Sequence, residues 1–230
     1  IEADIRQLEQ DAAQVLIQIQ TEAENLSGQR KHAAAKLAEL AKNELNALEM
    51  GNAVFDVDFS ARKITSPEQI SSKGGDRIGA DGLDVVRFLL SPNPGEPLKP
   101  LARIASGGEL SRIVLALKAV LSSSTSVGTL IFDEVDAGIG GATSEQVGLK
   151  LKQLSETHQV ICITHLAQIA KYGDRQFRIV KQVNDDRTCT TIIPLDDPAA
   201  RIEEIARMIG GKEITPATLA HARELIAAAG

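Results

Sequence analysis

One stretch, residues 105–141, limits what this chain can fold into more than any other. A glycine pair there precedes an amphipathic helix, a short apolar run ends in two carboxylates, and a further acidic turn follows. A helix and a buried strand in this order are typical of α/β folds, which bind ligands at the carboxyl ends of parallel strands. The chain is therefore expected to carry its chemistry where this strand ends.

The glycine pair lies at a predicted helix start. Ser106 stands at the N-cap position and Glu109 three residues later, which is the spacing of a capping box. Gly107 and Gly108 have no Cβ, so another group can approach the backbone closely. The free N–H groups and positive dipole of a helix start favour an anion, above all a phosphate. The alternative is a well-capped core helix that binds nothing, because capping boxes are common.

The strand predicted over residues 129–132 ends in Asp133 and Glu134. Hydrolysis of a nucleoside triphosphate requires a carboxylate to hold Mg²⁺ and a second group to orient the attacking water. Adjacent strand residues point to opposite sides, so the two acids can divide these tasks. The alternative, a solvated strand end, is disfavoured because an unpaired charge beside a buried strand is costly.

A second apolar run, residues 159–164, ends in His165. A single histidine is usually structural. Here its position on its own strand matches that of the acidic pair, so we expect His165 to share a site with Asp133 and Glu134.

These residues resemble known motifs. Residues 106–109 resemble the signature motif of ABC-type ATPases, residues 130–134 resemble their Walker B strand, Asp136 their D-loop and His165 their switch histidine. More specifically, residues 93–101 leading into 104–112 resemble the RecN family, bacterial ATPases of DNA double-strand-break repair related to SMC and cohesin proteins. Residues 133–141, 164–170 and 218–223 extend this similarity over nearly the whole chain.

The resemblance implies a C-terminal portion. The sequence contains no G-x-x-x-x-G-K-[ST] loop to cradle phosphates, and in ABC and SMC ATPases that loop lies near the N-terminus, before the coiled coil. The expected partners are therefore an N-terminal lobe carrying the P-loop and a second head, in a homodimer that clamps two ATP molecules. This chain alone is predicted to hydrolyse no ATP.

The resemblance also implies residue roles. Asp133 positions Mg²⁺ through water, Glu134 polarises the attacking water and His165 senses the γ-phosphate. The signature residues would contact a nucleotide held by the second head: Ser106, Gly107, Gly108 and Glu109. Hydrolysis would release the clamp, and the coiled coils would transmit the opening.

The predicted organisation is an α/β, ABC/SMC-type head lobe over residues 51–230, with a mainly parallel sheet and flanking helices, preceded by a helical arm over residues 1–50. Apolar residues of the arm alternate steps of four and three, a heptad pattern that falters at residues 25–28: Ile1, Ile5, Leu8, Ala12, Val15 and Ile19. The resemblance implies the returning strand of an antiparallel coiled coil. The alternative is an ordinary amphipathic helix pair.

Other elements follow from local patterns. Strands are expected at residues 52–60 and 82–91, a helix at 142–156, and a hairpin of 178–183 with 188–195. Residues 66–82 are predicted to form a loop. Two final helices are each opened by an N-cap residue followed by proline: Asp197 with Pro198, and Thr215 with Pro216.

Composition limits the partners. The formal charge of −6, the pI near 5.3 and the 3% aromatic content provide no nucleic-acid footprint. DNA, as ends or single strands, enters only through the resemblance. Cys162 and Cys189 suit a reduced cytoplasm, and the resemblance implies a bacterial one, near the nucleoid. Neither a membrane span, a secretory leader nor a zinc, calcium or dinucleotide motif is found, and the start at Ile1 suggests a fragment.

Three functions remain open from the sequence. The first is a repair ATPase head, favoured by residues 93–101 and by the helical entry. The second is the nucleotide-binding subunit of a membrane transporter, which shares the motifs but would not normally enter this half through a long helix. The third is a non-catalytic DNA tether, which would have no need of Asp133, Glu134 and His165.

Overall fold

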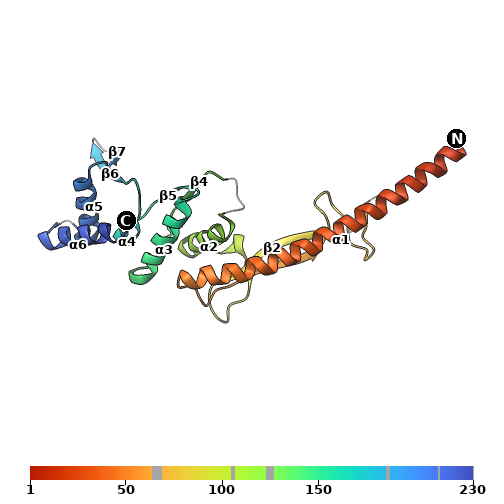
Figure 1. Cartoon of the computed structure of the whole chain (residues 1–230), viewed down its shortest axis with the longest axis horizontal. Coiled ribbons are helices and arrows are strands. Elements are labelled where there is room, and N and C mark those ends of the chain that lie inside the picture. The colour runs from red at the N-terminus through yellow and green to blue at the C-terminus, as the bar shows by residue number, and fades with distance from the viewer. Residues whose placement is uncertain (64–68, 105–106, 123–126, 185–186, 212, 230) are drawn as a thin grey trace. The chain divides into compact units, whose positions relative to one another are not determined.

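The computed structural model describes residues 1–63, 69–104, 107–122, 127–184, 187–211 and 213–229, with only the backbone of 182–184, 187 and 188. The chain forms two compact units. The first comprises residues 1–43 and 52–104, and the second 44–51 and 105–230. The boundaries between these units follow residues 43, 51 and 104, whereas the sequence predicted a single boundary near residue 50. Figure 1 shows their elements, and each unit is described by itself.

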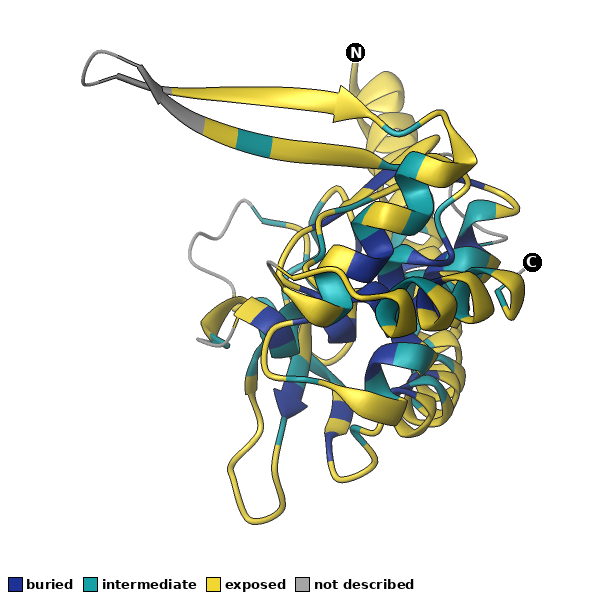
Figure 2. Cartoon of the chain, turned by 90° about the vertical axis from the view of Figure 1, so that its left-hand side faces the viewer, coloured by how far each residue is buried: buried dark blue, intermediate teal, exposed yellow. Residues whose placement is uncertain are grey.

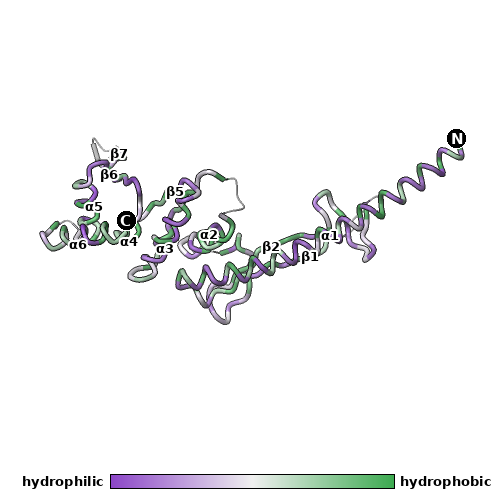
Figure 3. Tube along the Cα trace, viewed as in Figure 1, coloured by the Kyte–Doolittle hydropathy of each residue, from purple (hydrophilic) through white to green (hydrophobic). Residues whose placement is uncertain are grey.

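The first unit combines one long helix with an antiparallel sheet. Helix α1 spans Glu2–Ala47, and only its last residues belong to the second unit. Strand β1 (Val54–Ala61) pairs along its whole length with β2 (Asp84–Ser91), and β2 pairs with the short β3 (Lys99–Pro100), which leads into the 3₁₀ helix η1 (Leu101–Arg103). Much of α1 is hydrophilic (Figure 3), as the polar composition of residues 1–50 predicted.

Helix α1 is continuous through residues 25–28, where the heptad pattern falters. Ser27 is buried there, and its hydroxyl donates a 2.8 Å hydrogen bond to Oδ1 of the buried Asp84 on β2. Arg30, one turn further, lies 3.6 Å from the other Asp84 oxygen and donates to the Asp81 carbonyl at 2.8 Å. The interruption therefore lies where α1 contacts β2, and Ser27 there pairs a buried carboxylate that would be costly to leave without a partner.

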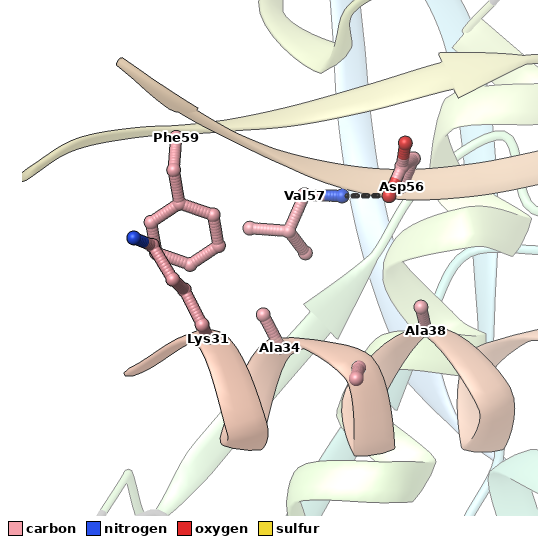
Figure 4. A pocket seen from close by; sticks show the side chains of 7 residues that line it. Lys31, Ala34, Ala38, Asp56, Val57 and Phe59 are labelled. Atoms are coloured by element: carbon pink, nitrogen blue, oxygen red, sulfur yellow. Dashed lines mark hydrogen bonds between the residues drawn. The ribbon is translucent and has the colours of Figure 1, made fainter. Parts of the chain in front are cut away.

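Strand β1 shows the predicted alternation at Phe55 and Asp56, whereas residues 57–60 are all half-buried. Phe55 is buried and its ring stacks on Phe88 of β2 with centroids 5.8 Å apart. Further along, Val57 and Phe59 face the small side chains Ala34 and Ala38 of α1 across a hollow of about 230 Å³ (Figure 4). Alanine leaves this space because its side chain is too short to fill the distance between helix and strand.

The second unit contains the predicted α/β elements. Helix α2 (Gly107–Leu121) is followed by β4 (Thr129–Phe132), α3 (Gly141–Ser155), β5 (Gln159–Cys162) and the short α4 (Ala167–Ala170). β4 and β5 run parallel, joined through α3. Leu130 and Phe132 on one face of β4 are buried, whereas their β5 neighbours Val160 and Cys162 are half-buried. Figure 2 colours the chain by burial.

The rest of the second unit is a hairpin and two helices. β6 (Phe177–Asn184) and β7 (Arg187–Pro194) pair antiparallel, which confirms the predicted hairpin. α5 (Pro198–Gly210) is capped by Asp197, and α6 (Pro216–Ala227) by Thr215 in a capping box, as predicted. These helices pack with α4 around a small core of Ala167, Ile205, Ala206 and Ala222.

The predicted α/β class is confirmed, but one detail needs correction. Among the described residues, parallel pairing is confined to β4 and β5, whereas the other two sheets are antiparallel. A mainly parallel sheet requires several strand–helix–strand units in succession, and the described part of the chain supplies one. No described helix combines the length and the apolar character that crossing a bilayer requires.

A buried polar cluster joins α3 to the end of α4. Glu145 accepts hydrogen bonds from the Lys171 ammonium at 2.7 Å and from the Tyr172 hydroxyl. The Tyr172 ring lies so close to Gly148 that an added Cβ would come within 2.5 Å of it. A glycine inside α3 is thus explained by packing, although glycine weakens a helix. Burial and the bond to Glu145 raise the pKa of Tyr172 to about 12, so its hydroxyl stays a donor.

This cluster predicts a specific loss of stability in acid. Burial raises the pKa of Glu145, but the bonds from Lys171 and Tyr172 outweigh it, so the pKa lies below the ordinary 4.5. A depressed carboxyl pKa stabilises the fold above 4.5, and this contribution is lost as pH falls through the folded-state pKa. Glu145→Gln should therefore flatten the acid limb of a melting-temperature curve. A variant with the same acid limb as wild type would contradict this.

Candidate active site

The carboxyl ends of β4 and β5 lie side by side. Phe132 pairs with Cys162, and the Ile163 N–H donates to the Phe132 carbonyl at 2.9 Å. The residues that follow each strand, Asp133 and Glu134 on one side and His165 on the other, therefore emerge at the same edge of the sheet. This is the shared location that the sequence predicted for them.

Asp133 and Glu134 are both exposed at this edge. Glu134 has φ of +57°, a left-handed conformation that residues other than glycine adopt at a cost. Two hydrogen bonds hold it: its N–H donates to Asp133 Oδ1 at 2.9 Å, and its carbonyl accepts from the Ala137 N–H at 3.0 Å. Such strained residues concentrate at functional sites.

The two glycines of the predicted phosphate turn have different surroundings. Gly107 is exposed, and an added Cβ would collide with the Glu134 carboxylate, which turns toward the start of α2. Gly108 is buried, and an added Cβ would lie 2.8 Å from the Cβ and carbonyl oxygen of Ala137. The absence of a side chain at Gly108 therefore allows the chain's own acidic turn to pack on α2.

Two side chains of α2 attach this turn to the helix. The Ser111 hydroxyl donates to the Asp133 carbonyl at 2.8 Å. The guanidinium of buried Arg112 donates to the carbonyls of Ala137 at 2.9 Å and Val135 at 3.4 Å. Burial lowers the pKa of Arg112, an effect that the Glu109 charge opposes. No role for either residue was predicted from the sequence. Polar side chains beside the apolar stripe of a predicted helix could have indicated hydrogen bonds to a neighbouring segment.

Asp136, the predicted D-loop residue, is only 4% exposed and joins the two strand ends. Its Oδ2 accepts from the Thr164 hydroxyl at 2.6 Å and from the His165 N–H at 2.8 Å, and it lies 2.9 Å from His165 Nδ1. The imidazole itself is 73% exposed. A buried carboxylate thus orients an exposed histidine at the sheet edge, with Thr164 as a third member that sequence reasoning missed.

Cys162 is the last residue of β5, next to this edge. Burial, followed by the charges of Asp136 and Asp133, raises the pKa of its thiol to about 12. A thiol with so high a pKa is a poor nucleophile and behaves as a small hydrophobic residue, in agreement with the interpretation from sequence. Both cysteines are free.

The site can be compared with its prediction residue by residue. Ser106 lies outside the described residues, and so does its predicted capping box with Glu109. Glu109 itself lies in the first turn of α2. The structure brings Asp133, Glu134 and His165 to one edge. The described residues contain no cluster of three or more metal-ligating side chains. Two exposed carboxylates suit Mg²⁺, which keeps several waters and takes other ligands from substrate phosphates.

Comparison with known proteins extends these observations. No family model matches the chain. It is 40% identical over 227 residues to the DNA repair protein RecN of Bacillus subtilis, covering 98% of this chain and 39% of that protein. It is 43% identical over 225 residues to RecN of Treponema pallidum, covering 98% and 38%. The chain thus spans about two fifths of the length of the relatives it matches.

Solved structures support the fold. The Smc head domain of Pyrococcus yayanosii, with a coiled coil and joint, matches with a TM-score of 0.58 and 18% identity, covering 92% of this chain and 36% of that one. The Smc head domain of Pyrococcus furiosus, with an extended coiled coil, matches with a TM-score of 0.53 and 18% identity, covering 89% and 46%. These matches confirm an α/β head lobe with a helical arm.

Proposed function

The chain belongs to the RecN family of DNA repair proteins, and from this premise we propose that it is the C-terminal part of an SMC-like ATPase head. The observation that carries the proposal is the meeting of Asp133, Glu134 and His165 at the carboxyl ends of two parallel strands. ATP is the substrate, and hydrolysis drives the opening of paired heads during repair of DNA double-strand breaks.

Glu134 is the general base of the proposed reaction. Its exposed carboxylate can accept a proton from the attacking water, and the turn that holds its backbone limits the directions it can take. To do so, it must leave the start of α2, where it lies against Gly107. His165 presents an exposed imidazole at the same edge, in a position to sense the γ-phosphate.

Asp133 is the proposed Mg²⁺ ligand, through water. Its carboxylate is exposed and one of its oxygens accepts the Glu134 N–H, which orients the group. Mg²⁺ bound there would neutralise charge on the phosphates. Ser106, Gly107, Gly108 and Glu109 form the proposed signature motif, which acts on the nucleotide of a second head. Of these residues, Gly108 contributes mainly by packing, because it is buried.

The open face of the parallel sheet supports a partner lobe that carries the P-loop. Ile131 is 69% exposed and Ile161 46% exposed on the face opposite the buried Leu130 and Phe132. Parallel sheets are normally covered on both faces. A lobe that covers this face would also supply the phosphate cradle that the sequence lacks.

The long helix distinguishes this proposal from its alternatives. α1 has 46 residues, and its N-terminal part is exposed, as expected for one strand of an antiparallel coiled coil. A transporter subunit would not normally enter this half of the head through such a helix. A simple DNA tether would not require the strand-end acids. We place the complete protein in the bacterial cytoplasm at the nucleoid, with DNA ends or single strands as partners.

The test compares the complete protein, which includes the P-loop lobe, with this chain alone. We expect the complete protein to hydrolyse ATP, to form ATP-dependent dimers in size-exclusion chromatography, and to turn over faster with linear or single-stranded DNA. This chain alone should hydrolyse ATP at the buffer rate, because the phosphate cradle is absent. Hydrolysis by the purified chain, or a complete protein without ATPase activity, would refute the proposal.

A further inference from the structure

Three contacts converge on one oxygen atom of the Asp136 carboxylate. The Thr164 hydroxyl, the His165 N–H and the His165 ring all meet one oxygen, Oδ2, at 2.6, 2.8 and 2.9 Å. The carboxylate is nearly inaccessible to water, so these donors replace its hydration. The hydroxyl of Thr164 makes the shortest of the three contacts.

The direction of each hydrogen bond follows from the groups involved. A carboxylate only accepts, so the Thr164 hydroxyl must donate to it. The Thr164 oxygen then accepts from the Leu166 N–H at 3.1 Å, at the start of α4. The hydroxyl hydrogen and one lone pair are therefore both committed, which leaves the Thr164 side chain one orientation.

The same reasoning defines the His165 ring. The ring nitrogen Nδ1 lies 2.9 Å from Oδ2, and because an ionised carboxylate carries no hydrogen, this close contact favours the tautomer with the hydrogen on Nδ1. Nε2 is the other ring nitrogen, and the His165 side chain is 73% exposed. A carboxylate that holds a histidine in one tautomer is a recurrent means of orienting a functional imidazole.

We propose that Thr164 is a positioning residue of the ATPase reaction: it holds Asp136 so that Asp136 keeps His165 in the Nδ1–H form with Nε2 presented to the nucleotide. This inference rests on the proposed function of His165. The effect of Thr164 on the imidazole tautomer does not depend on that function. Thr164 itself touches no substrate. Its hydroxyl is needed because valine, of the same shape, can neither donate to Asp136 nor accept from Leu166.

The kinetic test uses the complete protein with Thr164→Val and Thr164→Ser. We expect Thr164→Val to lower kcat for ATP hydrolysis about tenfold, with KM changed less than about twofold, because a hydrogen bond to a charged group is lost while ATP binding is unaffected. Thr164→Ser keeps the hydroxyl and should restore kcat to within about threefold of wild type. Wild-type kcat in Thr164→Val, or equal impairment of both variants, would overturn the proposal.

A second readout does not depend on hydrolysis. In ¹⁵N-histidine-labelled complete protein near pH 8.5, above the usual histidine range, long-range ¹H–¹⁵N spectra report the tautomer, and His165→Asn identifies the signal. We expect the Nδ1–H form in wild type and Thr164→Ser, and a mixture with the Nε2–H form in Thr164→Val. An unchanged tautomer in Thr164→Val overturns the positioning role. If the wild-type protein has no ATPase activity but Thr164→Val still shifts the tautomer as expected, only the proposed function is refuted.

Discussion

Glu134→Gln in the complete protein should abolish turnover while ATP-driven dimers persist. We expect steady-state hydrolysis to fall by about 10²-fold or more, the usual contribution of a general base. Glutamine has nearly the same shape and the same preference against φ of +57°, so the backbone turn should survive. Because the amide cannot take a proton from water, heads should close on ATP and stay closed.

A matched control separates this effect from a change of charge. Glu224→Gln alters an exposed glutamate on α6, whose side chain is 81% exposed, and should leave hydrolysis and dimerisation at wild-type levels. Hydrolysis is measured by phosphate release and dimerisation by light scattering with ATP. Wild-type phosphate release in Glu134→Gln would remove this residue from the role of base.

Gly108→Ala should destabilise the second unit, although alanine favours helices. The new Cβ would lie 2.8 Å from the Ala137 carbonyl oxygen and 3.2 Å from that of Glu134. These are backbone atoms and cannot rotate away, so the acidic turn must separate from α2. Overpacking of this kind costs about 1–3 kcal/mol, and we expect a melting temperature lower by roughly 5 °C or more.

Gly107→Ala is the control for this prediction, because it adds the same methyl group one residue earlier in the same helix. Its new Cβ would meet only the Glu134 carboxylate, the end of a flexible side chain that can turn aside. Thermal unfolding followed by circular dichroism should place Gly107→Ala within about 1 °C of wild type, as for most exposed substitutions. If both variants lose the same stability, the close packing of Gly108 is not the cause.

Several features of the fold could be predicted because their causes are local. The caps at Asp197 and Thr215 lie within three residues of the groups they satisfy. The hairpin of β6 and β7 follows from two neighbouring strand-forming segments, 178–183 and 188–195, that flank a short polar stretch. The carboxylates after β4 and the histidine after β5 could be located because each strand is marked by its own continuous apolar run.

Other features could not be predicted because their partners are distant in the chain. The heptad pattern suggested an interruption at residues 25–28, but Ser27 hydrogen-bonds Asp84, 57 residues away, and the helix continues. Periodicity describes how a segment distributes its own apolar residues. It carries no information on which buried carboxylate a serine will meet.

The sequence by itself determined which residues follow the two apolar strands, since each continuous apolar run is bounded by polar or charged residues. Only the tertiary structure decided how those ends are connected. It places Thr164 on Asp136, 28 residues earlier, and it gives Gly108 the chain's own turn as a neighbour. The physical reason is that a buried carboxylate needs a hydrogen-bond partner, and a buried glycine can be required by a close backbone contact. Which group becomes that partner or that contact depends on the packing of segments distant in the chain and is not encoded in a local pattern.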